Sequence, residues 1–368
     1  MLKKFRIENF KGFKTRFTLD LSKPGNYGFN TDCIRNGIVD KCAIYGINGI
    51  GKSNLGLAIF DIVNHLTEKN KEIGKYNENY LNLDGSKPYA SFEYEFQFGE
   101  DTLLYKYSKS GFATLVEESL SINDKEMLYY DYRAKKGYSN FKGSEFLNLE
   151  SNSANSRVKF IMGTAVLSDD DKENAVLLKF KEFIDHMLLF YSLRTNGFIG
   201  YKEGGDLLEK IIIEAGKLEG FERFLNSQGL HTHLVSVDTP EGKRIYFQHK
   251  NGLMHYFKEC STGMESLILL YSWLIQLEQC SFVYIDEFDA FYHYELAERI
   301  VKELKTFKDT QIIVTTHNTD LMSNDLLRPD CYFVLTDEKI DSLNRLTEKD
   351  LRLAHNLQKM FKAGAFNE

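Results

Sequence analysis

The stretch that decides the fold is residues 43–60, AIYGINGIGKSNLGLAIF. Its first three residues are apolar and predict a buried strand that ends at Gly46. Residues 52–66 carry apolar side chains three or four positions apart, a spacing that predicts a helix. The segment from Gly46 to Ser53 fits the pattern GxxxxGK(S/T). A strand, this glycine-rich loop and a helix, in that order, are the parts of a phosphate-binding loop.

Each part of this loop has an expected contact with phosphate. Glycines let the backbone turn tightly and direct N–H groups at phosphate oxygens, and the start of the helix adds its positive dipole end. Lys52 is expected to neutralise the β- and γ-phosphates, and the Ser53 hydroxyl to hold Mg²⁺. Chance produces the pattern in roughly 1% of chains of this length, which disfavours a plain glycine turn. The nucleotide-binding residues predicted from the loop are Gly46, Asn48, Gly49, Gly51, Lys52, Ser53 and Asn54.

A second apolar run, Phe282 to Ile285, is followed directly by Asp286 and Glu287. Such a run is typical of a strand buried on both faces, and ligands of α/β sheets bind at the carboxyl ends of their strands. Asp286 is expected to accept from Mg²⁺-bound water, and Glu287 to orient and deprotonate the attacking water. An acidic pair after a strand is, by itself, as often the start of a solvated helix. The phosphate-binding loop favours the functional interpretation.

Two further patterns are weaker. Residues 311–317, QIIVTTH, predict a buried strand that ends in His317, where the ring is in reach of a γ-phosphate or an attacking water. A single histidine at a strand end is more often structural. Residues 261–263, STG, precede a helix predicted over 264–278 and allow a second anion-binding helix terminus. Positions 262 and 265 also fit a capping box, so this pattern alone favours an ordinary helix start.

Composition limits the classes of function. The chain has 368 residues and a net charge of −7, which excludes a generally basic nucleic-acid surface but not a local basic strip. Five scattered cysteines without a CxxC pair argue against zinc and a disulfide framework. The opening MLKKFRIENF lacks the pattern of a signal peptide, and the most apolar stretch, residues 267–285, is interrupted by polar groups. We therefore expect a cytoplasmic protein with no membrane contact. The basic strip is Lys3, Lys4, Arg6, Lys11, Lys14 and Arg16.

The order of predicted elements indicates an α/β fold. A β meander over 90–133 is followed by helices over 172–193 and 206–226, and by strands over 232–258. Strands and helices then alternate, as in parallel sheets covered by helices, and a last helix is predicted over 348–362. We expect an N-terminal lobe at 1–160, a helical insertion at 161–230 and a C-terminal lobe at 231–368.

Taken together, the four motifs in this order resemble the ABC-type ATPase heads of the SMC, Rad50 and RecF kind. The wide separation of Lys52 and Asp286 (286 − 52 = 234) is similar to that of such heads. The resemblance extends to the AAA15/AAA21 and OLD-like ATPases of bacteria, many of them from anti-phage defence operons. It covers nearly the whole chain, including the opening FRIENFKGFK and the closing HNLQKMFKAGAFNE. It implies a P-loop NTPase fold of the ABC-ATPase head type, with a mixed β lobe, a helical insertion and a signature/Walker B lobe.

The resemblance also implies roles for single residues. The loop from Gly46 to Ser53 corresponds to Walker A, and Asp286 and Glu287 to Walker B. Three features depart from the pattern. The signature reads STGME rather than LSGGQ, no long heptad run for a coiled-coil arm separates the two halves, and no Toprim-like acidic cluster follows residue 320. Ser261, Thr262 and Gly263 correspond to the signature, which reaches the γ-phosphate bound by the other subunit. His317 corresponds to the switch histidine, and Asp289 belongs to the D-loop at Phe288–His293. Lys11 lies where such heads place a basic residue near the phosphates.

The function implied by the resemblance is a nucleotide-switched ATPase that uses ATP and Mg²⁺. ATP would lie between two copies of the chain in a homodimer or larger assembly. In a bacterial antiviral defence system the protein would act as a sensor or scaffold that controls a separate, operon-encoded effector protein. Two alternatives stay open: a RecF/Rad50-like DNA repair ATPase, for which DNA is a partner, and a non-hydrolysing ATP-dependent scaffold. DNA-stimulated hydrolysis distinguishes the first, and Glu287 argues against the second.

Overall fold

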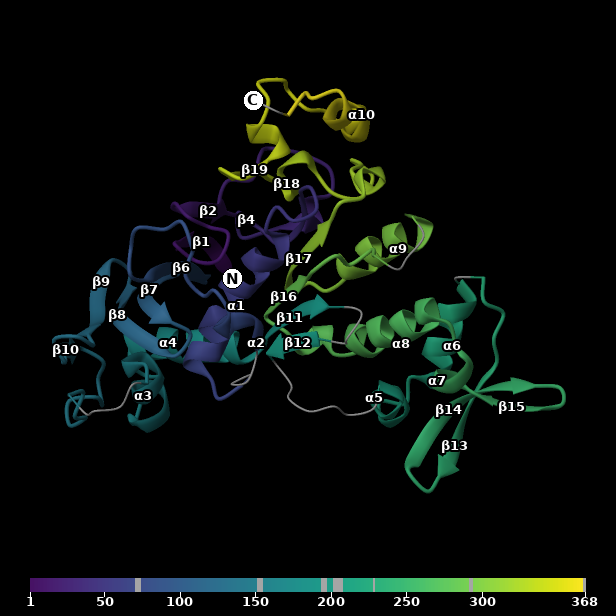
Figure 1. Ribbon diagram of the computed structural model, residues 1–368, viewed down its shortest axis with the longest axis horizontal. Helices are drawn as coiled ribbons and strands as arrows, with labels where there is room; N and C mark the ends of the chain where they lie inside the picture. Colours follow the sequence, from purple (N-terminus) through teal and green to yellow (C-terminus); the bar gives the residue numbers. More distant parts are fainter. Residues whose placement is uncertain are drawn as a thin grey trace.

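The computed structural model describes residues 1–69, 74–150, 155–192, 197–200, 208–227, 229–290 and 294–366. Figure 1 shows a three-cornered molecule, with a broad antiparallel sheet at one corner, a small sheet at another and the C-terminal segment at the third. Helices and a second large sheet lie between these corners. The predicted α/β class is confirmed.

The central sheet positions the candidate site. Its order is β12-β11-β16-β17-β5-β18-β19, and β11, β16, β17, β5 and β18 run parallel to one another. β16, β17 and β5 are neighbouring strands and run parallel, so their carboxyl ends lie at the same edge of the sheet. Every residue of β5, β16 and β17 is buried, which explains their continuous apolar runs. The bounds are β5 (Lys41–Tyr45), β11 (Met187–Ser192), β12 (Gly197–Gly200), β16 (Phe282–Ile285), β17 (Gln311–Thr316), β18 (Tyr332–Leu335) and β19 (Ile340–Ser342).

The N-terminal sheet is antiparallel and has the order β10-β9-β8-β7-β6-β1-β2. In β6 buried and half-buried side chains alternate, as expected for a sheet with one face on the core. Helix α1 (Lys52–Leu66), as predicted, lies between this sheet and the central one. The strand bounds are β1 (Leu2–Glu8), β2 (Phe17–Asp20), β6 (Ala90–Phe98), β7 (Asp101–Gly111), β8 (Thr114–Ile122), β9 (Lys125–Asp131) and β10 (Lys136–Ser139).

Helix α1 is fixed on both sides by close contacts. At Gly56 an added Cβ would lie 2.8 Å from the ring of Tyr284, so the absence of a side chain lets α1 approach β16. On the other side, the fully buried Asp61 accepts hydrogen bonds from Tyr107 at 2.8 Å and from the Lys109 amine at 2.6 Å. The helix that begins at the phosphate-binding loop is therefore held by both sheets.

A small third sheet, β13-β14-β15, has a hydrophobic core of its own. Helices α5 and α6 and the first half of α8 pack on it through residues such as Phe221, Ile245 and Ile268. The predicted boundary at residue 230 runs through this core, because α5 and α6 lie before it and the strands after it. The bounds are α5 (Leu208–Glu214), α6 (Leu218–Ser227), β13 (Leu234–Thr239), β14 (Gly242–His249), β15 (Gly252–His255), α7 (Tyr256–Glu259) and α8 (Thr262–Leu274).

The insertion predicted as helical at 161–230 is only partly so. The helix expected over 172–193 ends at Asp185, and the next residues, MLLFYS, form β11 in the central sheet. A short apolar run of this kind does not distinguish a buried strand from a buried helix. The helix expected over 348–362 is also shorter, because α10 covers only Leu357–Lys362.

The other bounds are β3 (Ile34–Arg35), β4 (Ile38–Val39), α2 (Gly74–Asn77), α3 (Arg157–Thr164), α4 (Lys172–Asp185), α9 (Tyr294–Leu304) and α10 (Leu357–Lys362).

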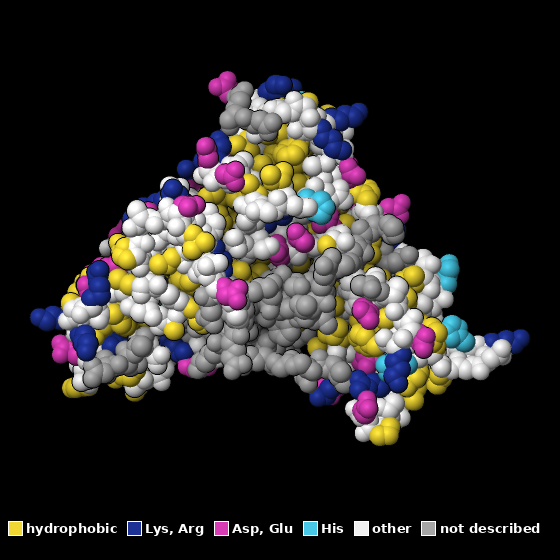
Figure 2. Space-filling model, in the orientation of Figure 1, with side chains coloured by type: hydrophobic (Ala, Val, Ile, Leu, Met, Phe, Trp, Pro, Cys, Tyr) yellow, Lys and Arg dark blue, Asp and Glu magenta, His cyan; other side chains and the backbone are white. Residues whose placement is uncertain are grey.

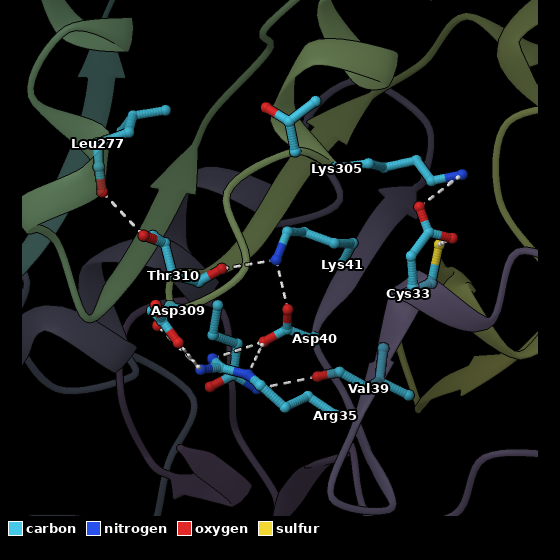
Figure 3. A network of polar contacts seen from close by, with 12 residues as sticks. Cys33, Arg35, Val39, Asp40, Lys41, Leu277, Lys305, Asp309 and Thr310 are labelled. Atoms are coloured by element: carbon cyan, nitrogen blue, oxygen red, sulfur yellow. Dashed lines mark hydrogen bonds and ion pairs between the residues drawn. The ribbon is translucent and has the colours of Figure 1, made fainter.

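Buried charges tie the amino ends of the parallel strands together (Figure 3). Lys41 opens β5, and its amine contacts the Asp40 carboxylate and donates to the Thr310 carbonyl at 2.7 Å. Arg35 donates to the same carboxylate and to the Asp309 carbonyl. Lys41 and Asp40 are almost fully buried, so loss of Asp40 would leave the buried Lys41 cation without a carboxylate, at a cost of about 3–5 kcal/mol. This network closes the end of the sheet opposite the phosphate-binding loop.

Candidate nucleotide-binding site

The loop between β5 and α1 has the backbone of a phosphate-binding loop. Gly49 and Gly51 have φ of +83° and +113°, a left-handed region that glycine adopts without strain. A Cβ at Gly46 would lie 2.8 Å from the Ile50 side chain and 3.1 Å from the Leu335 carbonyl. The loop residues Asn48 and Gly49 are exposed to solvent. The glycines are therefore needed for the shape of the loop.

Lys52 is the first residue of α1 and turns its side chain back over the loop. Its amine donates to the Gly46 carbonyl at 2.8 Å and to the Ile47 carbonyl at 3.2 Å. Burial lowers the pKa of Lys52, while the nearby carboxylates of Glu287 and Asp286 oppose that shift. The cation thus lies over the loop whose backbone would hold phosphate.

Ser53 and Asp286 meet directly. The Ser53 hydroxyl donates to one carboxylate oxygen of Asp286, and the Thr315 hydroxyl donates to the other at 2.7 Å. Asp286 is almost fully buried, and burial raises its pKa, while these two hydroxyls oppose the shift. A hydroxyl and a carboxylate side by side are the oxygen donors that Mg²⁺ prefers. The donor set therefore fits the metal expected from the sequence.

Glu287 lies at a sharp turn directly after β16. Its φ is +48°, which is strained for a residue with a side chain and typical of functional sites. Its N–H donates to the Thr315 hydroxyl at 2.8 Å, and the side chain is exposed. Near the middle of the face in Figure 2, acidic side chains cluster beside a histidine. An exposed carboxylate beside the phosphate-binding loop can accept a proton from water.

His317 and Asp289 lie beside the acidic pair. His317 follows the end of β17 and is exposed. Asp289 is buried and accepts a hydrogen bond from the Thr316 hydroxyl at 2.8 Å. Burial raises the pKa of Asp289, and the His317 ring opposes that shift. The Asp289 carboxylate points into the protein, whereas a contact between subunits would need it at the surface. Residues 291–293 of the predicted D-loop lie outside the described residues.

The predicted signature residues begin α8. Ser261 caps this helix, its hydroxyl accepting from the Met264 N–H at 3.4 Å, so the cap is one residue earlier than the capping box predicted. Ser261 is exposed, and a Cβ at Gly263 would meet only the Ser261 hydroxyl, at 3.8 Å. Figure 1 shows that α8 begins beside α6 and α7, away from the start of α1. The chain does not bring its own signature and phosphate-binding loop together.

Lys11 lies in the turn between β1 and β2, with a left-handed φ of +45°. Its amine donates to the Glu78 carbonyl at 3.0 Å, and burial lowers its pKa. The turn itself borders the loop, because a Cβ on Gly12 would lie 3.4 Å from the amide nitrogen of Asn54. Lys11 is therefore near the phosphate-binding loop, but its amine points at Glu78.

Most of the basic strip is neutralised by acids on neighbouring strands. Lys3 pairs with Glu95 at 2.7 Å, and Arg6 and Arg16 both pair with Glu93. Lys4 also lies 3.3 Å from an Asp20 oxygen. These pairs reduce the net positive charge that the strip presents to a phosphate backbone.

Sequence reasoning missed two residues of the site. Thr315 contacts both Asp286 and Glu287, and the Tyr284 hydroxyl donates to the Lys52 carbonyl at 2.7 Å. Both lie inside runs whose apolar character predicted buried strands. The only available signal was a polar side chain at a position where such a run is otherwise apolar.

Residues 42–323 match the family described as "AAA domain, putative AbiEii toxin, Type IV TA system". The chain belongs to this family. No curated protein matches the sequence significantly. Across the described residues, no helix is long and apolar enough to cross a membrane.

Solved structures with a similar arrangement include SMC head domains. One is the SmcHead bound to the C-winged helix domain of ScpA, with 16% identity, coverage of 94% of this chain and 98% of that chain, and a TM-score of 0.47. Another is the SMC head domain from Thermotoga maritima, with 18% identity, coverage of 90% and 94%, and a TM-score of 0.45. A third is the Smc head domain with an extended coiled coil bound to the C-terminal domain of ScpA derived from Pyrococcus furiosus. It has 15% identity, coverage of 94% of this chain and 97% of that chain, and a TM-score of 0.40. All three similarities are distant.

Proposed function

We propose that the protein binds Mg²⁺-ATP in the loop between β5 and α1 and hydrolyses it to ADP and phosphate. The observation that carries this proposal is the contact of Ser53 with Asp286 at the shared carboxyl edge of β5, β16 and β17. The membership of the AAA family supports a nucleotide as the ligand. The loop glycines, the Lys52 amine and the start of α1 supply the positive groups for the phosphates.

Ser53 and Asp286 would hold the Mg²⁺ ion. When bound, such an ion neutralises charge on the β- and γ-phosphates as the terminal bond breaks. Glu287 would accept a proton from the attacking water, because its exposed carboxylate belongs to the residue directly after Asp286. His317, which follows β17, would donate to the γ-phosphate.

We also propose that ATP is shared between two copies of the chain. The start of α8, where Ser261 is exposed, would contact the γ-phosphate bound by the other copy through Ser261, Thr262 and Gly263. This is supported by the separation of α8 from the start of α1 within one chain (Figure 1). In that assembly Asp289 would have to turn outward from Thr316 to reach the partner, and Lys11 would have to leave the Glu78 carbonyl to reach phosphate.

At the level of the cell, we propose a nucleotide-controlled sensor in a bacterial antiviral defence system, acting on a separate effector. The support for this proposal is the family description, which names a putative toxin and a type IV toxin–antitoxin system. The test is a phage challenge of cells that carry the gene and its neighbours, in wild-type, Lys52→Ala and Glu287→Gln form. Protection that both substitutions leave unchanged would contradict this role.

The alternative of a DNA repair ATPase has less support. The basic strip that would contact DNA is largely paired with acids. Hydrolysis measured with and without duplex DNA decides between the two functions. We expect DNA to leave the rate unchanged, whereas a marked stimulation would favour the repair function. A protein that binds ATP without turning it over would instead be a scaffold.

A further inference from the structure

We infer that Thr315 is a positioning residue for ATP hydrolysis, which fixes the metal-binding Asp286 and the base Glu287 relative to each other. The inference rests on the proposed function and adds a residue to it. Thr315 lies near the end of β17, between the strand that carries the acids and the strand that leads into the loop. It is fully buried, so it does not itself contact a nucleotide.

Thr315 contacts three consecutive residues of the acidic turn. Its hydroxyl donates to the Asp286 carboxylate at 2.7 Å and accepts from the Glu287 N–H at 2.8 Å. Its carbonyl accepts from the Phe288 N–H at 3.1 Å. A hydroxyl can donate one hydrogen bond and accept another at the same time, which a valine or alanine side chain cannot do. One side chain therefore sets both the carboxylate and the backbone turn.

The position of Thr315 explains why the turn needs it. The pairing of β16 with β17 ends at Ile285 and Val314, so Asp286 and Thr315 are the first residues past the ladder. Past the end of the ladder, the Thr315 hydroxyl accepts from the N–H of Glu287, whose backbone is left-handed, and the Thr315 carbonyl accepts from the next N–H. The backbone of Thr315 also pairs with Ile44 in β5. Thr315 thus connects the strand that leads into the loop with the acidic pair.

Asp286 is fixed from two sides by this arrangement. Ser53, from the loop, binds one carboxylate oxygen and Thr315 binds the other. Loss of the Thr315 hydroxyl would free one oxygen of Asp286 and the N–H of Glu287 together. The carboxylates would then lose their relative orientation, while Lys52 and the loop N–H groups would keep their places for the phosphates. The expected effect is on the rate of hydrolysis rather than on ATP affinity.

The test uses three variants of the full-length protein. Thr315→Val removes the hydroxyl and keeps the shape, and Thr315→Ser restores the hydroxyl. Thr310→Val is the matched control, because Thr310 is a buried residue just before the start of the same strand. Its hydroxyl lies 2.8 Å from the Leu277 carbonyl oxygen (Figure 3) and 2.9 Å from the Cys280 carbonyl oxygen, at the end of β17 opposite Thr315. The measurements are kcat, ATP affinity and the thermal midpoint of each variant.

We expect Thr315→Val to lower kcat by about 10- to 100-fold, as misplaced catalytic groups do. ATP affinity should stay within about threefold of wild type, and Thr315→Ser should recover most of the rate. Thr310→Val should lower thermal stability but leave kcat close to wild type. A kcat in Thr315→Val no lower than in Thr310→Val, or no recovery with serine, would overturn the inference.

Peptide-level amide hydrogen exchange over residues 285–290 gives a readout that does not depend on activity. The inference predicts faster exchange in Thr315→Val than in Thr310→Val, because the Glu287 N–H loses its acceptor. Equal exchange in the two variants would overturn the inference even if ATP is hydrolysed. Faster exchange in a protein that does not hydrolyse ATP would instead overturn the proposed function and, with it, the role of Thr315 in hydrolysis.

Discussion

The Ser53 hydroxyl donates a hydrogen bond of 2.5 Å to Asp286, although 233 positions separate the two residues in the chain. One follows the glycine-rich loop after β5, and the other follows β16. The contact forms because β17 holds these two strands parallel and in register, so that both end at the same edge.

Replacing Lys52 with alanine should weaken ATP binding by about 10- to 100-fold and abolish hydrolysis. The reason is the loss of a charged donor to the phosphates, whose hydrogen bonds are among the stronger ones in proteins. Titration calorimetry measures the affinity. Lys172→Ala, at an exposed lysine in the first turn of α4, is the matched control and should bind ATP normally. Unchanged affinity in Lys52→Ala would rule out the loop as the phosphate site.

Asp286→Asn and Ser53→Ala should both raise the Mg²⁺ concentration needed for half-maximal hydrolysis. Each removes one expected oxygen donor, and changes at metal sites typically lower affinity by at least about tenfold. Metal titrations of the hydrolysis rate at saturating ATP provide the measurement. The same half-maximal Mg²⁺ concentration in wild type and both variants would show that the metal is held elsewhere.

Two inactive variants should restore activity when they are mixed. Lys52→Ala inactivates the phosphate-binding loop, and Gly263→Asp inactivates the signature. A side chain at position 263 has open space in the single chain, so the second substitution should not disturb folding. A mixed dimer keeps one intact site, so a 1:1 mixture with free subunit exchange should reach about one quarter of wild-type activity. The alternative result is an inactive mixture despite verified exchange, and it would exclude a site shared between copies.

The buried pair of Asp61 and Lys109 should matter for folding. Lys109→Met leaves the Asp61 carboxylate buried without its cation, at a cost of about 3–5 kcal/mol in the free energy of unfolding. Lys125→Met, which breaks the exposed pair with Glu173, should cost at most about 1 kcal/mol. Denaturant unfolding of both variants tests the difference. Similar losses in the two proteins would show that the buried pair contributes no more than a surface pair.

The parts of the fold that could be predicted are those with a local signal. The helix from Lys52 to Leu66 and the strand before Asp286 follow directly from spacing and apolar runs. The strand β11 was predicted as helix because its six residues are apolar or small and lie directly after a helix. Its pairing with β16 is a long-range contact that the local pattern does not contain.

Within the site, residue types were easier to predict than orientations. Asp289 is predicted to contact the other subunit, whereas in the single chain its carboxylate accepts a hydrogen bond from the Thr316 hydroxyl inside the protein. Lys11 was expected at the phosphates, and its turn does border the loop, but its amine contacts the Glu78 carbonyl. Side-chain directions of this kind depend on neighbours from distant segments. The role inferred for Thr315 has the same origin, since its partners come from a neighbouring strand.

In the proposed hydrolase, Glu287 is the base. Paired measurement of ATP turnover and bound nucleotide for wild type and Glu287→Gln tests this role most directly. Glutamine keeps the shape but cannot accept a proton, so turnover should fall by about 10²- to 10⁴-fold while ATP and Mg²⁺ stay bound. ATP should then accumulate in the protein in place of ADP. Turnover near the wild-type rate in Glu287→Gln, or no Mg²⁺-dependent hydrolysis by the wild-type protein, would contradict the account.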